Sequence, residues 1–378
     1  MKSVLSLLGF LFIASAAGAQ YNRTESAILL LKTADSLLRI EPVTITSVAS
    51  PNPFGDKHDY YSEGPYWWPN PEDPEGPYIR RDGERNPARF IAHHKILDDM
   101  RDAVTILTAA YRLSMEEKYA LHVVKHLQAW FVAPETRMNP SLLYAQAIKG
   151  VSIGRGIGII DTVALIAVAR AIRILEDAGM LKGADISGIK DWFSQYATWM
   201  TTHPQGIEER DNGNNHSSWW AAQVAMYGTL TGRAELLDTA RVQFKKQLSA
   251  QMNAAGAFPE ELARTNPYGY TMYNLDALSA TAYLASSPRE NLWNYKGTHG
   301  SLKKAWHYMY PFIVDKSKWP YKQDITNYDR LPAQSIGLLL AATALNQKDW
   351  MQTWESLAPR STPVGAIDNA LYFRLLWL

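Results

Sequence analysis

The chain contains no cysteine among its 378 residues. Disulfide bonds, cysteine-ligated metal sites and the lipidated cysteine of a lipoprotein are therefore excluded. The formal net charge is only +1, so overall electrostatics gives no reason to expect binding to nucleic acid or to an anionic membrane. An anionic partner would have to be recognised by a local cluster of residues.

Long apolar runs are also missing, with one short exception at the N-terminus. Lys2 precedes an apolar stretch from Val4 to Ile13, and the small residues 17–19 follow. This run is shorter than the roughly 20 residues of a membrane span, and the pattern is typical of a secretory signal peptide. We expect cleavage after residue 19, a single mature domain of residues 20–378, and location in the bacterial periplasm without membrane attachment.

Strand-like alternation is scarce, and most of the chain has a helical period instead. In residues 115–131, Tyr119, Val123 and Leu127 recur every four residues, which places them on one helix face. Two segments share a helix that ends near a tyrosine (Tyr111, Tyr227), a short loop and a new helix, as in stacked helix pairs. We therefore predict an all-α chain, with an α/α toroid favoured over an open solenoid. Further helical stretches cover residues 159–175, 190–200, 218–230, 234–248, 274–285 and 332–345.

Residues 51–90 break the helical pattern. Their many prolines and glycines exclude a helix, and their aromatic residues argue against a disordered linker. We expect an ordered loop that lines or covers a cleft. The whole chain is rich in aromatic residues, with 13 Trp and 20 Tyr, and flat rings of this kind stack well on sugar rings.

Three segments combine polar residues that could form a site. The sequence RDNGNNHSSWW at 210–220 places Asn214, Asn215 and His216 before a predicted helix, where an N-cap explains only one of them. Residues 256–278 hold Arg264 in a stretch broken by proline and glycine. Beside this arginine stand Glu260, Glu261, Tyr268, Tyr270, Tyr273 and Asn274. Residues 144–161 carry Gln146 and Arg155 as polar positions in an apolar, glycine-rich segment.

Amide, imidazole, guanidinium and phenol groups together suit β-elimination on a uronic acid polymer. The C5 proton of a uronate is poorly acidic until the adjacent carboxylate is neutralised, which Asn, His and Arg donors can do. A base then removes this proton and an acid protonates the O4 leaving group. A tyrosine can serve both steps when the proton and O4 lie on the same side of the ring, and a neighbouring arginine favours its phenolate. This chemistry needs no metal and no organic cofactor.

In these segments the sequence resembles the alginate lyase superfamily, which includes family-5 alginate lyases and family-38 glucuronan lyases. The resemblance rests on the NNH step at Asn214–His216, on the later Arg and Tyr, and on the segments 62–87 and 144–161, and it covers roughly residues 45–345. It implies an α/α toroid with Asn215, His216 and Arg264 neutralising the carboxylate. Its catalytic tyrosine falls best on Tyr270, which follows Arg264 by six residues.

In family-5 enzymes the tyrosine follows the arginine by seven residues, a position that is Thr271 here. This difference leaves Tyr273 and Tyr268 as reserve candidates for the catalytic tyrosine. It also favours a glucuronan-type enzyme. The expected substrate is an acidic polysaccharide, glucuronan or poly-mannuronate. Which uronate is used, whether the enzyme acts within or at the end of the polymer, and the oligomeric state stay open. His216 is the reserve base for a C5 proton and O4 on opposite faces. Candidate substrate-binding residues are Tyr61, Trp67, Trp68, Arg80, Arg85, Gln146, Arg155, Asn214 and Tyr273.

Three alternatives remain. A glycoside hydrolase on the same fold would need two carboxylates, and Asp211, Glu260 and Glu261 are available for that role. A glycan-binding protein without activity would also be rich in aromatic residues. A histidine-ligated metal is the weakest alternative, since the i, i+4 spacing of His122 and His126 and the adjacent His93 and His94 stand without an acidic ligand motif.

Overall fold

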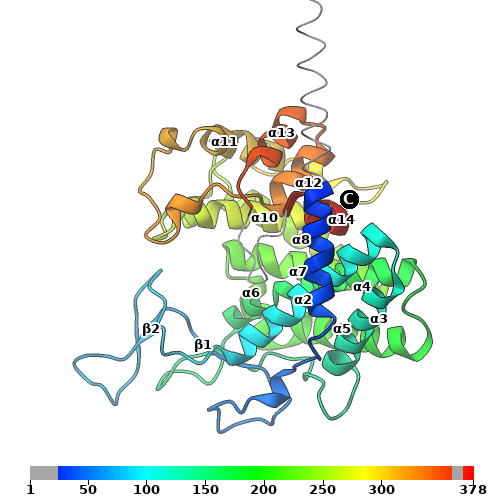
Figure 1. Cartoon of the computed structure of the whole chain (residues 1–378). Helices are drawn as coiled ribbons and strands as arrows, with labels where there is room; N and C mark the ends of the chain where they lie inside the picture. Colours follow the sequence, from blue (N-terminus) through cyan, green and yellow to red (C-terminus); the bar gives the residue numbers. More distant parts are fainter. Residues whose placement is uncertain (1–23, 360–368) are drawn as a thin grey trace, which may run out of the picture.

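The computed structural model describes residues 24–359 and 369–378, so the predicted signal peptide at 1–19 lies outside the described part. Helices make up most of this part, as predicted (Figure 1). Across the two described ranges, no helix is both long and apolar enough to cross a membrane. The first helix covers residues 24–37. The other α-helices are α2 (Ala92–Ser114), α3 (Glu117–Phe131), α4 (Ala164–Asp177), α5 (Gly183–Thr202), α6 (Pro204–Arg210), α7 (Asn215–Thr231), α8 (Ala234–Gln251), α9 (Pro259–Leu262), α10 (Pro267–Ala285), α11 (Leu302–Val314), α12 (Ile336–Ala344), α13 (Lys348–Ser356) and α14 (Asn369–Trp377).

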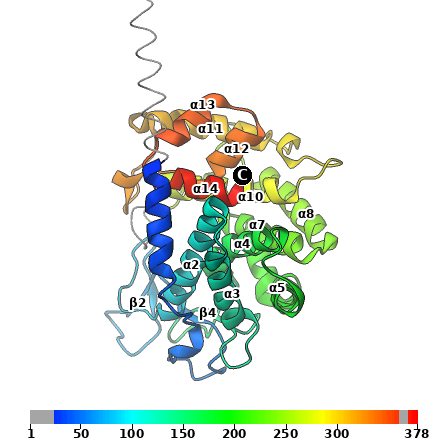
Figure 2. The same cartoon turned by 45° about the vertical axis from the view of Figure 1, so that its right-hand side comes forward.

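Successive helices form the pairs that the sequence predicts. Helix α2 ends at Met115 (φ 61°) and α7 ends at Gly232 (φ 73°), both in the left-handed conformation that closes a helix C-terminus. The next helices, α3 and α8, begin within two residues and pack back on their predecessors. Figure 2 shows the pairs stacked around the molecule.

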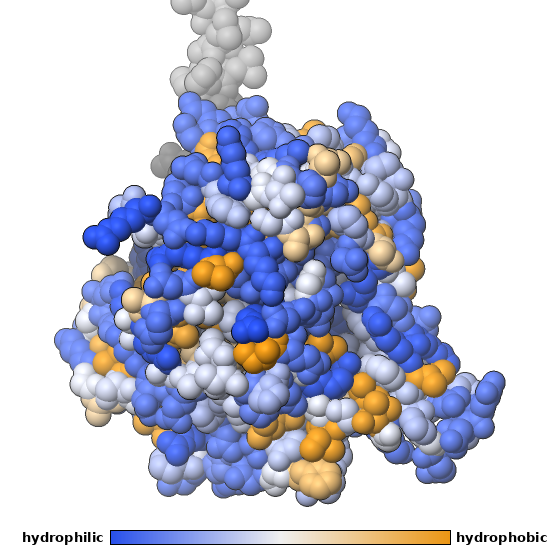
Figure 3. All heavy atoms as spheres, turned by 180° about the vertical axis from the view of Figure 1, so that it is seen from behind, coloured by the Kyte–Doolittle hydropathy of each residue, from blue (hydrophilic) through white to orange (hydrophobic). Residues whose placement is uncertain are grey.

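Helices α7 and α10 lie at the centre of this arrangement. Helix α7 packs against α4, α5, α8 and α10, while α10 also contacts α8 and α12. Most residues of both helices are buried, as expected for helices that neighbours surround. The buried apolar residues of the described chain form one cluster, and on the face in Figure 3 apolar residues appear only in small groups. The N-terminal ends of α7 and α10 carry the candidate catalytic residues.

Two predicted helices have different boundaries in the structure. Helix α10 begins at Pro267 instead of 274, so Tyr268, Tyr270 and Tyr273 stand on its first turns and not in a preceding loop. Proline fits the first helical position because the N–H it lacks has no partner there. The segment predicted as one helix at 159–175 is divided into the 3₁₀ helix η2 (Gly156–Thr162) and α4.

Residues 51–90 contain no helix, as predicted, and form an extended loop with short strands. Strand β1 (Tyr61–Glu63) pairs in parallel with β4 (Tyr144–Ala147), which ties the loop to the glycine-rich segment. Strand β2 (Trp67–Trp68) pairs antiparallel with β3 (Ile79–Arg80). The resulting β2–β3 hairpin projects at the lower left of Figure 1.

Candidate active site

The start of α7 gives each residue of the NNH step a separate role. Asn214 is the N-cap, and its side-chain oxygen accepts the backbone N–H of His216 at 3.0 Å. Asn215 is buried, and both its backbone N–H and its side-chain amide donate to the carboxylate of Glu261, at 2.7 and 2.9 Å. The capping role predicted for an asparagine here is confirmed, and it engages the side-chain oxygen of Asn214, a residue that was also expected to bind substrate.

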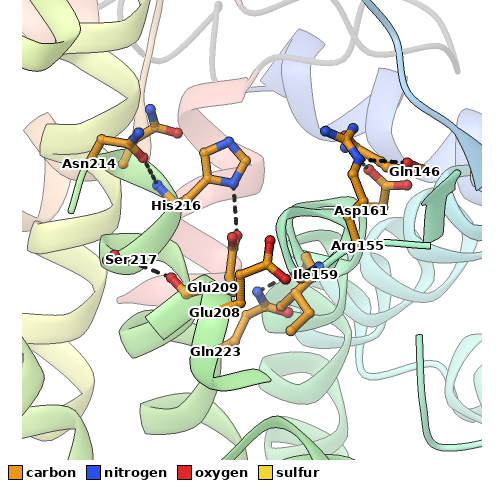
Figure 4. A network of polar contacts seen from close by, with 12 residues as sticks. Gln146, Arg155, Ile159, Asp161, Glu208, Glu209, Asn214, His216, Ser217 and Gln223 are labelled. Carbon is orange, nitrogen blue, oxygen red and sulfur yellow. Dashed lines mark hydrogen bonds and ion pairs between the residues drawn. The ribbon is translucent and has the colours of Figure 1, made fainter. Parts of the chain in front are cut away.

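His216 is oriented by a buried carboxylate from the preceding helix. Its Nδ1 lies 2.8 Å from Oε1 of Glu209 at the end of α6, and the two side chains are 17% and 1% exposed (Figure 4). Burial alone would lower the pKa of His216, but the charge and hydrogen bond of Glu209 outweigh burial and raise it. The imidazole is thus held with Nε2 directed away from Glu209 and with its charged form favoured.

Arg264 and Tyr270 form a second cluster, at the junction of α9 and α10. The guanidinium donates to the Tyr270 hydroxyl at 2.9 Å and lies 4.0 Å from the centre of its ring. Two residues of the 51–90 loop complete the cluster. Tyr66 shares a hydrogen bond of 2.8 Å with the Tyr270 hydroxyl, and Asp82 pairs with Arg264 at 3.0 Å.

The electrostatics of this cluster correct one expectation about Tyr270. Burial raises the pKa of its phenol, and neighbouring Tyr66 adds to this effect. Arg264 lowers the pKa, as expected from the sequence, but does not outweigh burial. The resting side chain is therefore a neutral phenol at neutral pH. For Asp82 the balance is opposite, because Arg264 outweighs burial and lowers its pKa to about 2.

The two clusters are close enough to influence one another. The charges of Glu261 and Arg264 both shift the pKa of His216, and Arg264 and His216 both act on Glu261. The structure therefore brings Asn215, His216, Arg264 and Tyr270 into one region, although they come from two segments some fifty residues apart.

Gln146 and Arg155 form a third group next to this region. Arg155 donates through Nε to the Gln146 carbonyl at 2.9 Å and through a terminal nitrogen to its side-chain oxygen at 3.1 Å. The Gln146 amide donates to buried Asp161 at 2.8 Å (Figure 4). Gln146 adopts a left-handed backbone (φ 50°), which is costly for a residue other than glycine and which these hydrogen bonds stabilise. The adjacent Gly156 is bonded to Glu208, the neighbour of Glu209.

The predicted binding residues of the 51–90 loop lie in different environments. Trp67 lies beneath the Arg155 guanidinium, 5.7 Å from its ring centre, which places it next to the third group. Trp68 instead donates to the Glu84 carbonyl and contacts Arg81, so it stabilises the hairpin. Arg80 pairs with Asp82, and Arg85 is exposed. Tyr61 is buried with its hydroxyl bonded to Glu63, which indicates a structural role.

The structure separates the three tyrosine candidates. Tyr268 is fully buried, and its hydroxyl donates to the Phe312 carbonyl, so it is unsuited to contact substrate. Tyr273 is half-buried with its ring against Trp219. Tyr270 alone of the three is bonded to Arg264 in the described chain. The geometry therefore favours Tyr270.

The three carboxylates that a hydrolase could use do not form an acid–base pair, because each has a different environment. Asp211 forms surface ion pairs with Arg210 and Lys246. Glu261 is buried and holds Asn215, while Glu260 is exposed. Of the histidine pairs, His93 accepts the Tyr61 N–H and His122 lies 2.9 Å from the Ile40 carbonyl, so both have structural partners. His94 lies beside the carboxylates of Asp98 and Asp161. In residues 24–359 and 369–378 there is no group of three potential metal ligands.

Four residues of the site were missed by the sequence reasoning. Glu209, Tyr66, Asp82 and Asp161 each hold a candidate residue through a side-chain hydrogen bond or ion pair. Glu209 and Asp82 stand in polar stretches where a solvated role is usual, and Asp161 ends an apolar segment. Their partners are brought to them only by the fold. Tyr66 was one of several aromatic residues in its loop with nothing in the sequence to single it out.

Comparisons with known proteins agree with this geometry. The family model described as alginate lyase matches residues 44–319. A crystal structure of an alginate lyase from Bacteroides ovatus is 34% identical, with 92% of each chain covered and a TM-score of 0.82. The chain belongs to the alginate lyase family. As a member of this family it is a polysaccharide lyase.

The alginate lyase family also includes more distant relatives among the solved structures. Alginate lyase A1-III from Sphingomonas species A1 is 16% identical, with 85% of this chain and 87% of that chain covered and a TM-score of 0.57. A histidine-to-alanine variant of A1-III in complex with a tetrasaccharide has a TM-score of 0.58, at 16% identity and with 85% and 88% covered. These matches confirm the predicted α/α-toroid fold. The comparison with curated protein sequences gave no match.

Proposed function

We propose that this alginate lyase family member cleaves a 1,4-linked polyuronate by β-elimination and leaves a 4,5-unsaturated uronate at the new non-reducing end. The observation that carries this proposal is the 2.9 Å hydrogen bond between Arg264 and Tyr270, next to the oriented His216 and buried Asn215. It joins a group that can move a proton to a group that can neutralise a carboxylate.

In the proposed reaction, Arg264, Asn215 and His216 bind the carboxylate of the sugar that loses its C5 proton. Their positive charges and N–H donors stabilise the negative charge that develops as the C5–H bond breaks. Glu209 raises the pKa of His216 and so favours the charged imidazole for this task. Asn215 is held in place by Glu261, which binds both its backbone and its side chain.

Tyr270 is the proposed base and acid. Its phenolate takes the C5 proton, the C5 electron pair forms the C4–C5 double bond, and the C4–O4 bond breaks as Tyr270 returns the proton to O4. The neutral resting phenol must first lose its own proton to solvent water, and Arg264, which donates to this hydroxyl at 2.9 Å, stabilises the phenolate that results. One residue then performs both transfers, which suits a C5 proton and O4 on the same face.

The proposed substrate is glucuronan or the poly-mannuronate of alginate. The Bacteroides ovatus relative is described as an alginate lyase, and the A1-III variant was solved with a tetrasaccharide. Mannuronate and glucuronate differ at C2 but place the C5 proton and O4 in the same relation, so one site suits both. The N-terminal sequence supports the bacterial periplasm as the place of reaction, with residues 20–378 as the mature domain.

Replacing Tyr270 with phenylalanine tests this mechanism. Tyr270→Phe removes only a hydroxyl, so we expect product formation to fall by about 10²–10⁴-fold. The fold should remain, because the hydroxyl contacts only Tyr66 and Arg264 among the described residues. Formation of the conjugated double bond is followed by ultraviolet absorbance on poly-mannuronate, poly-guluronate and glucuronan.

Tyr268→Phe is the matched control. It also removes one tyrosine hydroxyl from α10, but the hydroxyl is bonded to the Phe312 carbonyl away from the site. We expect the free energy of unfolding to fall by about 1–3 kcal/mol, with activity kept. A Tyr270→Phe variant as active as the wild type would overturn the role assigned to Tyr270.

A further inference from the structure

A concave surface lies outside the candidate active site, in the segment of residues 315–330 between α11 and α12. It encloses about 330 Å³ and combines an ammonium, a hydroxyl, an amide and several aromatic rings. Its lining residues are Lys316, Ser317, Trp319, Tyr321, Gln323 and Tyr328. This mixture of flat apolar surface and a few polar groups is characteristic of sites for small polar ligands.

The segment 315–330 is attached to the backbone that carries Arg264 and Tyr270. The Asp324 carboxylate accepts the N–H groups of Tyr268 and Gly269, both at 2.8 Å. The Ile325 N–H donates to the Thr265 carbonyl at 3.2 Å. The groove and the candidate active site are therefore built on two sides of the same five-residue stretch, 265–269.

The same segment also meets the 51–90 loop. A Cβ placed on Gly83 would lie 2.8 Å from Cδ1 of Ile325, so the two loops are in contact at this point. Figure 1 shows the segment in orange and the loop in cyan on the same side of the molecule. The segment that carries the groove therefore touches both the backbone beneath the candidate active site and the loop beside that site.

Neighbouring rings hold the aromatic residues of the groove in fixed positions. Trp319 packs edge-on against Tyr268 at 5.0 Å and against Phe312 at 5.3 Å. Tyr321 packs against Trp319 at 5.0 Å, and its hydroxyl is bonded to that of Tyr308 at 2.7 Å. Tyr321 nevertheless remains 39% exposed. A ring that is both fixed and exposed binds a ligand at little cost in conformational entropy.

The charge of the groove comes from Lys316. Its ammonium donates to the carbonyls of Tyr328 and Leu331 at 2.7 and 2.6 Å and lies 4.3 Å from the Tyr328 ring centre. An ammonium has three N–H donors, so one is left for a ligand. Across the described ranges Lys316 forms no ion pair. Two carboxylates of the segment have other partners: Asp315 is bonded to Ser317 and Lys318, and Asp324 to two backbone amides.

We propose that this groove is a distal subsite that binds a uronate unit of the same polysaccharide chain, outside the reaction centre. Tyr321 contacts the sugar ring, Lys316 binds the carboxylate, and Gln323 and Ser317 bind hydroxyl groups. The inference rests on the proposed function for the identity of the ligand. It adds that long chains are bound more tightly than short ones because they reach this subsite.

The test compares substrates of different length. For Tyr321→Ala we expect kcat/KM on the long polyuronate to fall about tenfold, as for the loss of one aromatic contact, with kcat/KM on a trisaccharide unchanged. Tyr321→Phe keeps the ring and loses only the bond to Tyr308, so it should behave like the wild type on both substrates. If kcat/KM of Tyr321→Ala fell equally on both substrates, or did not fall on the long polyuronate, the proposed subsite would be wrong.

Binding provides a second measurement that does not depend on turnover. In the Tyr270→Phe background, calorimetry with the intact polyuronate should show weaker binding for Tyr321→Ala and for Lys316→Gln, which keeps a donor for the two carbonyls but removes the charge. Unchanged affinity in both variants contradicts the subsite. A wild type that produces no unsaturated ends contradicts the proposed function instead, and the calorimetry still decides whether the groove binds the polymer.

Discussion

Glu209 affects the proposed chemistry through the charge and orientation of His216. Its carboxylate lies 2.8 Å from Nδ1 of His216 and keeps the pKa of this imidazole above its ordinary value. Because the pKa is raised, the charged imidazole persists at higher pH than it would in a free histidine. A charged imidazole is the form that neutralises a substrate carboxylate.

We therefore expect Glu209→Gln to lower the pKa of His216 and to move the loss of kcat/KM on the alkaline side to lower pH. The pH dependence of kcat/KM, together with NMR titration of the histidine ring, measures both effects. Glu208→Gln is the control, since Glu208 is exposed and bonds Gly156 instead of His216. An unchanged imidazole pKa in Glu209→Gln contradicts the assigned role.

At the level of single residues, the sequence predicted the donors but not their supports. Residue type singled out the segments of Asn215, His216, Arg264 and Tyr270, the family resemblance implied their roles, and the structure brings them together. The roles of Glu209, Glu261 and Asp82 depend on contacts between α6, α7, α9 and the 51–90 loop. Such contacts between distant segments leave no periodic signal in the sequence.

Among the elements, the segment 144–158 determines where Arg155 lies. Strand β4 is paired with β1, and the chain then turns back so closely that a Cβ on Gly154 would lie 1.9 Å from the Leu143 carbonyl oxygen. Only glycine fits this approach without movement of the backbone. The position of Arg155 against Gln146 and Trp67 depends on it.

Gly154→Ala should therefore displace Arg155, lower the free energy of unfolding by about 1–3 kcal/mol and reduce activity. Gly183→Ala is the matched control, because Gly183 has a left-handed backbone (φ 58°) but no atom within 4 Å of an added Cβ. It should cost about 1–2 kcal/mol with activity kept. Thermal unfolding and the rate of double-bond formation measure the two effects. Full activity in a folded Gly154→Ala protein would show that Arg155 does not need this position.

Element types were predicted well and element ends less well. The helical stretches appear as α3, α4, α5, α7, α8, α10 and α12 because their apolar residues have a clear helical period. The start of α10 was placed too late, since proline and glycine at 267 and 269 were taken to exclude a helix. In the structure Pro267 begins the helix, and Gly269 is tolerated where its N–H donates to Asp324.

For the whole molecule, fold and family follow from the sequence, while the location of the site follows from the arrangement of the helices. The two most buried helices, α7 and α10, both present their N-terminal ends to the site, and the 51–90 loop contacts Arg264 and Tyr270 from the other side. The α/α toroid thus places rigid donors opposite a loop rich in aromatic residues. This arrangement suits a long acidic polymer.

The most direct measurement counts two products in one reaction. The purified wild-type protein is incubated with poly-mannuronate or glucuronan in the presence of a chelator, and unsaturated ends and new reducing ends are quantified together. Elimination predicts one unsaturated end for each new reducing end, with no loss of rate on chelation. New reducing ends without ultraviolet absorbance would show hydrolysis and contradict the account.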